Sequence, residues 1–292
     1  MKISVLCFDL SINAFGRAWL LAKALSTFYD VEIIGASRRG GTWAPIGHAE
    51  IPVKEFAWGR YPNFSRIKKN ILDAIDGDII LASKLMPTSF GIGLQKKYSS
   101  GKPLILDIDD WELGFFYHAG FWGRMGRFMN FSNPNGLPYV WRMEGLVRHA
   151  DAITVSNRFL QKKFGGALLP NCRATKIFDP IKFNSGQIKE EIGLKGKKVV
   201  MFLGTPRPHK GLDDLLVAFK KIDDRNLNLV IIGTENQHEF LKKVDQSIRH
   251  RVMVLPQTPF DKLPEFLSVA DIIAIPQRRT SDSIGQMPAK LY

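Results

Sequence analysis

The chain has 292 residues, and its 41 Lys and Arg residues against 28 Asp and Glu residues give a formal net charge of +13. Hydrophobic residues make up 45% of the chain and charged residues 24%, which suits a folded globular protein and excludes wholesale disorder, collagen and coiled coil. At about 100–200 residues per domain, the length predicts two domains, each large enough to bury a core.

The two cysteines, Cys7 and Cys172, are too few for a disulfide framework, and Cys172 has no His or Cys at zinc-ligand spacing. No apolar stretch approaches the ~18–20 residues of a membrane span, and Asp9 interrupts the short apolar run at the N-terminus. We therefore expect a cytoplasmic protein. Its positive charge is spread along the chain without a nucleic-acid-binding motif, so nucleic acid is not an expected partner.

Short apolar runs alternate with amphipathic stretches through the first half of the chain. A helix is expected at 18–28, and strands are expected at 3–8, 31–34, 79–81, 104–106 and 152–155. This alternation predicts an α/β fold of βαβ units, in which helices cover both faces of a parallel sheet.

The second half repeats the alternation more clearly. Helices are expected at 212–221 and 263–269, and strands at 199–203, 229–232, 252–255 and 272–275. Residues 168–194 are interrupted by Pro and Gly and are interpreted as a linker and the start of the second domain. The predicted domains are residues 1–180 and residues 181–292, each with a Rossmann-like parallel sheet.

The most informative segment is FLGTPRPHKGLDDLLVAF, residues 202–219. A buried strand ends there, a glycine-containing loop follows, and a helix begins. Ligands of open α/β sheets bind beyond the carboxyl ends of the strands, where a helix N-terminus favours anions. Arg207 and Lys210 add two positive charges at this edge, and together they suit a diphosphate. The alternative is that both are ordinary solvated loop residues.

This loop resembles the donor-phosphate loop of the retaining GT-B glycosyltransferases of family four, which carries Gly-x-x-Arg-x-x-Lys-Gly between a strand and a helix. Gly204, Arg207, Lys210 and Gly211 fit that arrangement. The resemblance extends to VIIGTE at 230–235, to residues 251–277, and to HADAITVSNRFL and LLPN…IFDP at the end of the first half. Each piece is short, but their order and spacing together are specific.

The resemblance implies a GT-B fold, in which two Rossmann-like domains face a cleft. It implies glycosyl transfer from a nucleotide-sugar donor to a glycan or lipid-linked acceptor, with retention at the anomeric carbon, no cofactor and no essential metal. Arg207 and Lys210 would act on the leaving diphosphate. The other residues assigned to the donor are Gly204, Gly211, Gly233, Gly285, Gln286 and Met287.

The acceptor would lie on the first domain, brought close to the donor by interdomain closure. The first loop, residues 9–25, has one glycine before its helix where the family has a richer pair. Gly16 and Arg17 are candidates there, although an ordinary turn with a surface arginine is an equal alternative. Asp109, Asp110 and His118 are further candidates for the cleft, and a surface role is the favoured alternative for His118.

Asp107-x-Asp109 follows a strand, and such a pair can hold a divalent metal in another glycosyltransferase architecture. The two Rossmann-like halves and the Arg/Lys loop argue against that architecture, so no metal site is expected. Residues 115–131, FFYHAGFWGRMGRFMNF, are dense in aromatics, Met and Arg. A loop and helix near the acceptor is the favoured interpretation, and peripheral contact with the inner face of a membrane is the less favoured one.

The family has two glutamates eight positions apart near its donor site. The position matching the first falls near Gly285, and the second would follow Tyr292, so the second domain is expected to be incomplete. The predicted function is therefore a glycosyltransferase of carbohydrate biosynthesis. The alternatives are a catalytically incompetent nucleotide-sugar-binding fragment and, less favoured, a basic protein that binds membrane surfaces.

Overall fold

The computed structural model describes residues 1–46, 50–117, 121–173, 175–234, 236–256, 258–259, 262–281 and 283–288. The chain divides into two compact units. Unit 1 comprises Met1–Asn171 and Thr280–Ala289, and unit 2 comprises Cys172–Arg279 and Lys290–Tyr292. The change of unit after Asn171 lies nine residues before the predicted boundary, and the segment that begins at Thr280 is grouped with unit 1 rather than with the second half.

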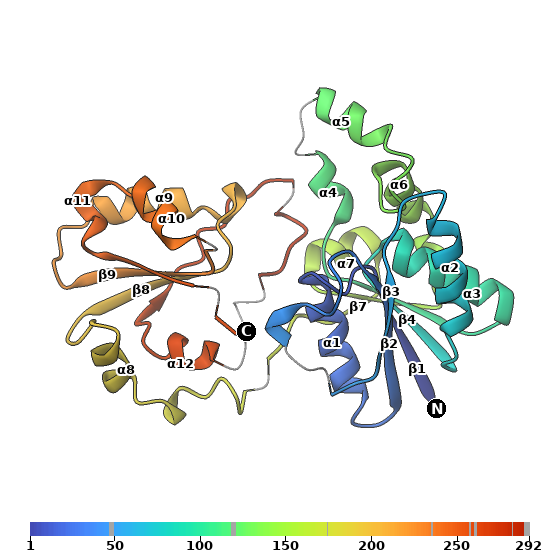
Figure 1. The fold of residues 1–292 in the computed structure, drawn as a ribbon, viewed down its shortest axis with the longest axis horizontal. Helices are drawn as coiled ribbons and strands as arrows, with labels where there is room; N and C mark the ends of the chain where they lie inside the picture. Colours follow the sequence, from blue (N-terminus) through green and yellow to red (C-terminus); the bar gives the residue numbers. More distant parts are fainter. Residues whose placement is uncertain are drawn as a thin grey trace. The chain divides into compact units, whose positions relative to one another are not determined.

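Unit 1 is built on a seven-stranded sheet whose order is β3-β2-β1-β4-β5-β6-β7, with every paired strand parallel (Figure 1). Its strands are β1 (Lys2–Cys7), β2 (Asp30–Ser37), β3 (Val53–Ala57), β4 (Ile79–Ser83), β5 (Leu104–Ile108), β6 (Ala152–Val155) and β7 (Ala167–Leu168). The order reverses between β1 and β4, so the carboxyl ends of these two strands form a topological switch point, where open α/β sheets bind ligands.

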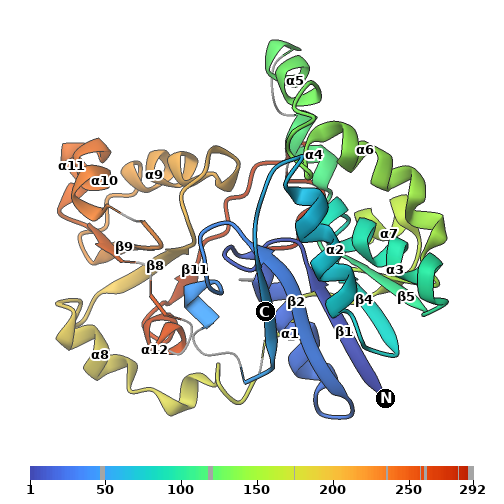
Figure 2. The ribbon, with the colours of Figure 1, turned by 45° about the vertical axis from the view of Figure 1, so that its right-hand side comes forward.

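Helices cover both faces of this sheet (Figure 2). They are α1 (Ala14–Leu25), α2 (Phe64–Ala74), α3 (Ile92–Ser100), α4 (Glu112–Tyr117), α5 (Phe121–Phe128), α6 (Leu137–Leu146) and α7 (Arg158–Phe164). Successive side chains of β1 point to opposite faces of the sheet and so enter two different cores. Val5 packs with α1 on one face, and Leu6 packs with residues of α2, α3, α6 and α7 on the other. Burial on both faces explains why these strands read as continuous apolar runs.

Unit 2 is built on a parallel four-stranded sheet of order β10-β9-β8-β11. Its strands are β8 (Lys198–Leu203), β9 (Leu227–Ile232), β10 (Val252–Leu255) and β11 (Ile272–Ile273), and its helices are α8 (Ser185–Glu191), α9 (Leu212–Lys220), α10 (Gln237–Lys243), α11 (Gln246–Arg249) and α12 (Leu263–Leu267). Phe202 packs with α9 and α11 on one face, and Met201 packs with α8 and residues around α12 on the other. The switch point lies between β8 and β11.

The predicted α/β class and the predicted parallel sheets are confirmed. The prediction for residues 168–194 is incomplete, because α8 forms inside the segment interpreted as a linker. Ile188 of α8 is buried against β8 and β9, and this apolar packing stabilises a helix of only seven residues. The strand predicted at 272–275 is shorter, since β11 ends at Ile273 before Pro276.

Candidate functional site

Two glycines shape the loop after β8 in unit 2. Gly204 and Gly233 follow the adjacent strands β8 and β9, and their backbone φ angles are +126° and +114°. A Cβ atom on Gly233 would lie 2.8 Å from the carbonyl carbon of Gly204. The two chain segments therefore approach so closely that a side chain at Gly233 is excluded, which fixes where the loop leaves the sheet.

Gly211 closes the same loop from the other side of the switch point. Its φ angle is +69°, and a Cβ atom there would lie 1.8 Å from the carbonyl oxygen of Pro276, which follows β11. Between Gly204 and Gly211 the chain forms a 3-10 turn at Pro208–Lys210, an element that the sequence pattern did not predict. The loop is thus held by close backbone approaches to the segments that follow β9 and β11, the two neighbours of β8 in the sheet.

The start of α9 is also tied to the segment after β11. The Arg278 guanidinium donates two hydrogen bonds of 2.6 Å to the Asp214 carboxylate, and the Arg278 backbone N–H donates one of 2.9 Å to the His209 carbonyl. Asp213 and Asp214 both lie in the first turn of α9. These carboxylates stabilise the helix N-terminus but oppose a ligand phosphate there, so attraction for an anion must come from the loop cations.

Those cations are the two predicted from the sequence. Arg207 precedes the 3-10 turn and is exposed, and Lys210 ends the turn and is half-buried. The structure therefore places both residues of the predicted pair on one loop at the switch point of unit 2. Gly204, Gly211 and Gly233 lie there as well, and each has a positive φ angle that only glycine adopts without strain.

Lys84 marks the switch point of unit 1. It follows β4 directly and is a non-glycine residue with a positive φ angle, +75°. Its backbone N–H donates a 2.8 Å hydrogen bond to the Asp107 carbonyl, and its own carbonyl accepts one of 2.9 Å from the Ser89 hydroxyl. A left-handed backbone at such a residue is costly and persists only where the surroundings fix it, as is common at functional sites.

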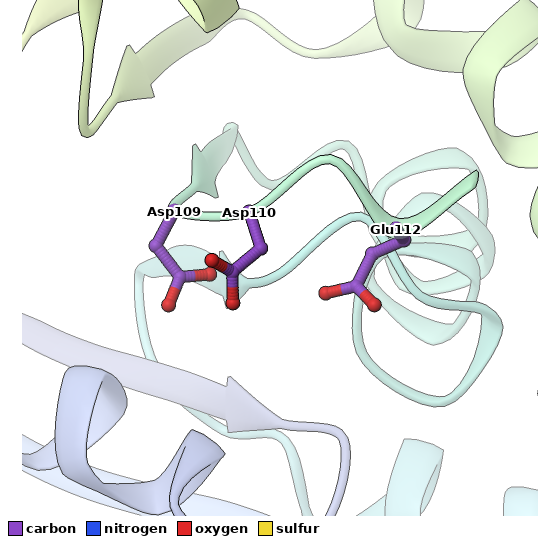
Figure 3. A group of neighbouring side chains, drawn as sticks. All are labelled: Asp109, Asp110 and Glu112. Atoms are coloured by element: carbon purple, nitrogen blue, oxygen red, sulfur yellow. The ribbon is translucent and has the colours of Figure 1, made fainter. Parts of the chain in front are cut away.

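The Lys84 ammonium group lies among three carboxylates that follow β5. Its Nζ atom is 2.7 Å from Asp109, 2.5 Å from Asp110 and 3.2 Å from Glu112. Figure 3 shows the three carboxyl groups turned toward a common space beyond the end of the strand. We call Lys84, Asp109, Asp110 and Glu112 the Lys84 cluster. The exposed fraction of the Asp110 side chain is 25%, against 13% or less for the other three, so Asp110 is the member most open to a ligand.

Burial and charge act in opposite directions on these groups. Burial lowers the pKa of Lys84, but Asp109, Asp110 and Glu112 raise it more, so its pKa lies well above the usual value and it stays charged. Burial, with help from Asp110 and Asp109, raises the pKa of Glu112 to about 7 in spite of Lys84. Carboxylate oxygens of the three acids lie within 4.8 Å of one another, as in a metal site, but the ammonium already supplies their positive charge.

The candidates of the first loop have different surroundings from those expected. Gly16 lies in the first turn of α1, where a Cβ atom would be 3.2 Å from the Trp43 ring, so its small size serves packing. Arg17 is buried rather than on the surface. Its guanidinium donates hydrogen bonds of 3.0 and 2.8 Å to the Asp107 carboxylate and one of 2.8 Å to the Leu169 carbonyl. The structure gives both residues a role in holding unit 1 together.

The remaining candidates lie on unit 1 or outside the described residues. A Cβ atom on Gly285 would lie 2.3 Å from Cβ of Trp111, and the Gly285 carbonyl accepts a 3.1 Å hydrogen bond from Asn157. The Met287 carbonyl accepts one of 3.2 Å from Asn171, and Gln286 lies between these two anchored residues. This segment therefore packs beside the residues that carry the Lys84 cluster. His118 lies outside the described residues.

Sequence reasoning missed Lys84 and Glu112. The end of the strand at residues 79–81 was predicted, so a cation following it at the sheet edge was available as a signal. The left-handed backbone of Lys84 and its position among three carboxylates could not be predicted from the sequence, because both depend on contacts with a loop more than 20 residues away.

Among the residues that the structure describes, no helix is both long and apolar enough to span a bilayer.

The sequence comparisons agree with this arrangement of unit 2. Residues 184–288 match the family model described as glycosyl transferases group 1. A GDP-mannose-dependent α-(1-6)-phosphatidylinositol monomannoside mannosyltransferase of Mycolicibacterium smegmatis is 27% identical over 141 residues, which are 44% of this chain and 37% of that protein. An uncharacterized glycosyltransferase of Methanocaldococcus jannaschii is 30% identical over 92 residues, 30% of this chain and 24% of that protein. The chain thus spans well under half of either curated relative.

Solved structures establish the fold. HepE of Anabaena, crystallised with UDP-glucose, has a TM-score of 0.67 and 16% identity, and the match covers 94% of this chain and 73% of HepE. Sucrose-phosphate synthase from Thermosynechococcus elongatus has a TM-score of 0.69 and 13% identity, with 96% and 76% covered. The GT-B fold expected from the sequence is confirmed by these structures, and residues 184–288 match the glycosyl transferases group 1 family.

Proposed function

We propose that this chain is a glycosyltransferase that moves a sugar from a nucleotide-sugar donor to a glycan or lipid-linked acceptor, with retention and without an essential metal. The observation that carries the proposal is the loop of unit 2. Arg207 and Lys210 stand at the switch point on a loop whose course is fixed by Gly204 and Gly211. This loop lies inside the segment that matches the glycosyl transferases group 1 family.

The chemistry follows from the charge that develops in the reaction. Transfer breaks the bond between the anomeric carbon and an oxygen of the donor diphosphate, so negative charge builds on the leaving group. Cations held in advance beside that oxygen stabilise the transition state without having to rearrange. The Arg207 guanidinium can bind two phosphate oxygens and Lys210 supplies a point charge, a role that a divalent metal plays in other transferases.

The acceptor would bind at the switch point of unit 1. Ionised carboxylates accept hydrogen bonds from sugar or polyol hydroxyls, and Asp110 is the open member of the Lys84 cluster. The Lys84 ammonium group already pairs with the three acids, so a divalent metal would have to displace it to use them as ligands, which supports a reaction without metal. A lipid-linked acceptor, as in the name of the mycobacterial relative, would bring the enzyme to a membrane surface.

The test is a donor screen with matched variants. The chain is incubated with UDP-, GDP- and ADP-sugars, and release of nucleoside diphosphate and sugar transfer are measured with and without EDTA. We expect Arg207→Ala and Lys210→Ala to lower the rate by about 10²–10³-fold each. The exposed Arg225 and Lys221 of the same unit provide controls, and their alanine variants should keep the wild-type rate.

Three outcomes would contradict the proposal. Near-normal turnover in both Arg207→Ala and Lys210→Ala would remove the assigned role of the loop. Loss of activity in EDTA that added divalent metal restores would overturn the metal-independent reaction. Binding of nucleotide sugars with no turnover of any of them would favour a nucleotide-sugar-binding module instead.

A further inference from the structure

The segment from Leu113 to Met143 is chemically unlike the rest of the chain. Nine of its 31 residues are aromatic, against 32 of 292 in the whole chain. It contains three arginines and no aspartate or glutamate. Clustered aromatic residues with basic and no acidic neighbours are typical of surfaces that meet anionic lipid headgroups.

The structure leaves the apolar side chains of this segment on the surface. Trp122 and Met125 of α5, followed by Met129, share one side of the helical turn at spacings of three and four residues. Trp122 is 79% exposed and Met129 is 67% exposed. Such spacing usually marks the side of a helix that packs on a core, but here that side faces solvent.

Phe128 and Phe131 extend the same surface. Both are exposed, and their rings contact each other edge to face, with centroids 6.4 Å apart. We call Trp122, Met125, Phe128, Met129 and Phe131 the α5 patch. Five large exposed apolar side chains within ten residues of the chain are unusual for a free protein surface and indicate a binding surface.

The α5 patch is held on a fixed support. Figures 1 and 2 show α5 standing away from the sheet of unit 1, with α4 and α6 beneath it, and α5 packs against both of these helices. The Phe131 carbonyl accepts a 2.9 Å hydrogen bond from the Tyr139 hydroxyl. Arg60 donates a 3.1 Å hydrogen bond to the Ser132 hydroxyl, which places a further cation beside the patch. The helix can therefore present its apolar side without local unfolding.

We propose that the α5 patch docks the protein on an anionic lipid bilayer, with α5 lying in the plane of the headgroups. Trp122, Phe128 and Met129 would enter the boundary between headgroups and acyl chains, and Arg60 and Arg127 would face lipid phosphates. The electrostatics favour a bilayer over a second copy of the chain. Two copies of a chain with a net charge of +13 would have to bring together two segments that each carry three arginines and no aspartate or glutamate.

This inference goes beyond the proposed transferase reaction and does not depend on it, because the test needs no donor or acceptor. The whole chain is mixed with phosphatidylcholine vesicles or with vesicles of equal phosphatidylcholine and phosphatidylglycerol, and the bound fraction is measured by flotation at low and high NaCl. We expect binding to the phosphatidylglycerol vesicles, weakened by salt, and little binding to phosphatidylcholine alone.

The decisive variant carries Trp122→Ser, Phe128→Ser and Met129→Ser. Removing three side chains from the lipid boundary should weaken vesicle binding by about tenfold or more, since a tenfold change corresponds to about 1.4 kcal/mol. Phe28→Ser is the matched control, because Phe28 is also 79% exposed but lies outside the segment. Far-UV circular dichroism of the triple variant should match that of the wild type, since all three side chains are on the surface.

Absence of binding to phosphatidylglycerol vesicles, or equal binding by the triple variant and the wild type, would overturn the proposal. Analytical ultracentrifugation tests whether the chain forms a dimer instead. If the wild type does not bind vesicles but forms a dimer, and the triple variant does not, the α5 patch binds a second copy of this chain and not lipid.

Discussion

The switch points of the two units have opposite chemistry. In unit 1, one buried ammonium group lies among three carboxylates, and the cluster retains excess negative charge. In unit 2, Arg207 and Lys210 lie on a loop whose path is set by glycines at close backbone approaches. The same position in two Rossmann-like sheets thus offers hydrogen-bond acceptors in one unit and cations in the other.

The two sites also differ in how they are held in place. The Lys84 cluster depends on its own charges, because each group in it would be costly to bury without the others. The unit 2 loop depends on backbone geometry, because Gly211 and Gly233 leave room for close approaches to Pro276 and Gly204. This difference predicts that charge substitutions destabilise unit 1 strongly, whereas changes in glycine destabilise unit 2.

The largest expected effect is that of Lys84→Met. The substitution keeps the volume of the side chain but leaves three partly buried carboxylates without their cation, and should lower the unfolding free energy of unit 1 by about 3–5 kcal/mol. All six tryptophans lie in unit 1, so denaturation followed by tryptophan fluorescence reports on that unit.

Lys23→Met, in the same unit, is the control for this substitution. It removes a cation from an exposed pair with Glu50, where about 0–1 kcal/mol is expected. A loss of less than 1 kcal/mol for Lys84→Met would show that the cluster is not held by its central charge, and the contrast between the two switch points would disappear.

The next effect is that of Gly211→Ala in unit 2. A left-handed backbone costs alanine about 1–2 kcal/mol, and Cβ would also overlap the Pro276 carbonyl. Gly193→Ala separates these causes, because Gly193 has a φ of +76° and nothing within 4 Å of its Cβ position. Hydrogen exchange of the β8 and β9 amides should show a clearly larger loss of protection for Gly211→Ala. Equal losses would mean that the contact with Pro276 does not fix the loop.

The smallest effect concerns pH and Glu112. Its pKa is about 7 in the folded chain, above the ordinary value of 4.5, so between these values the folded state binds the proton more tightly than the unfolded state. The stability of unit 1 should therefore be highest below pH 4.5 as far as this group is concerned, and should fall as the pH rises to 7.

Glu112→Gln keeps the shape of the side chain but cannot ionise. Between pH 5 and pH 7, the unfolding free energy of this variant should fall by about 1–2 kcal/mol less than that of the wild type, measured by tryptophan fluorescence. Glu55→Gln, at an exposed residue of unit 1, should leave the profile unchanged. An unaltered slope in Glu112→Gln would show that Glu112 does not titrate in this range.

Much of the fold could be predicted because the apolar runs are buried on both sides. The strand at residues 152–155 and that at residues 252–255 were predicted with the bounds that the structure has. Partly exposed elements escaped this signal. In β3 no residue is fully buried, and its sequence VKEFA carries no continuous apolar run, so it was not predicted.

The candidate sites show the same division. The positions of Arg207 and Lys210 follow from local order along the chain, strand then glycine loop then helix, which one sequence displays. Arg17 could not be judged in this way, because its partner Asp107 lies 90 residues further along the chain. Charge type is visible in a sequence, but whether a charge meets a ligand or a buried carboxylate depends on long-range packing.

The central claim is that the unit 2 loop binds the donor diphosphate. A crystal structure of the chain soaked with UDP or GDP tests it most directly. We expect the diphosphate within hydrogen-bond distance of the Arg207 guanidinium and the Lys210 ammonium group, beside the backbone that follows Gly204. A nucleotide bound with its phosphates elsewhere, with both side chains turned away from it, would contradict the account.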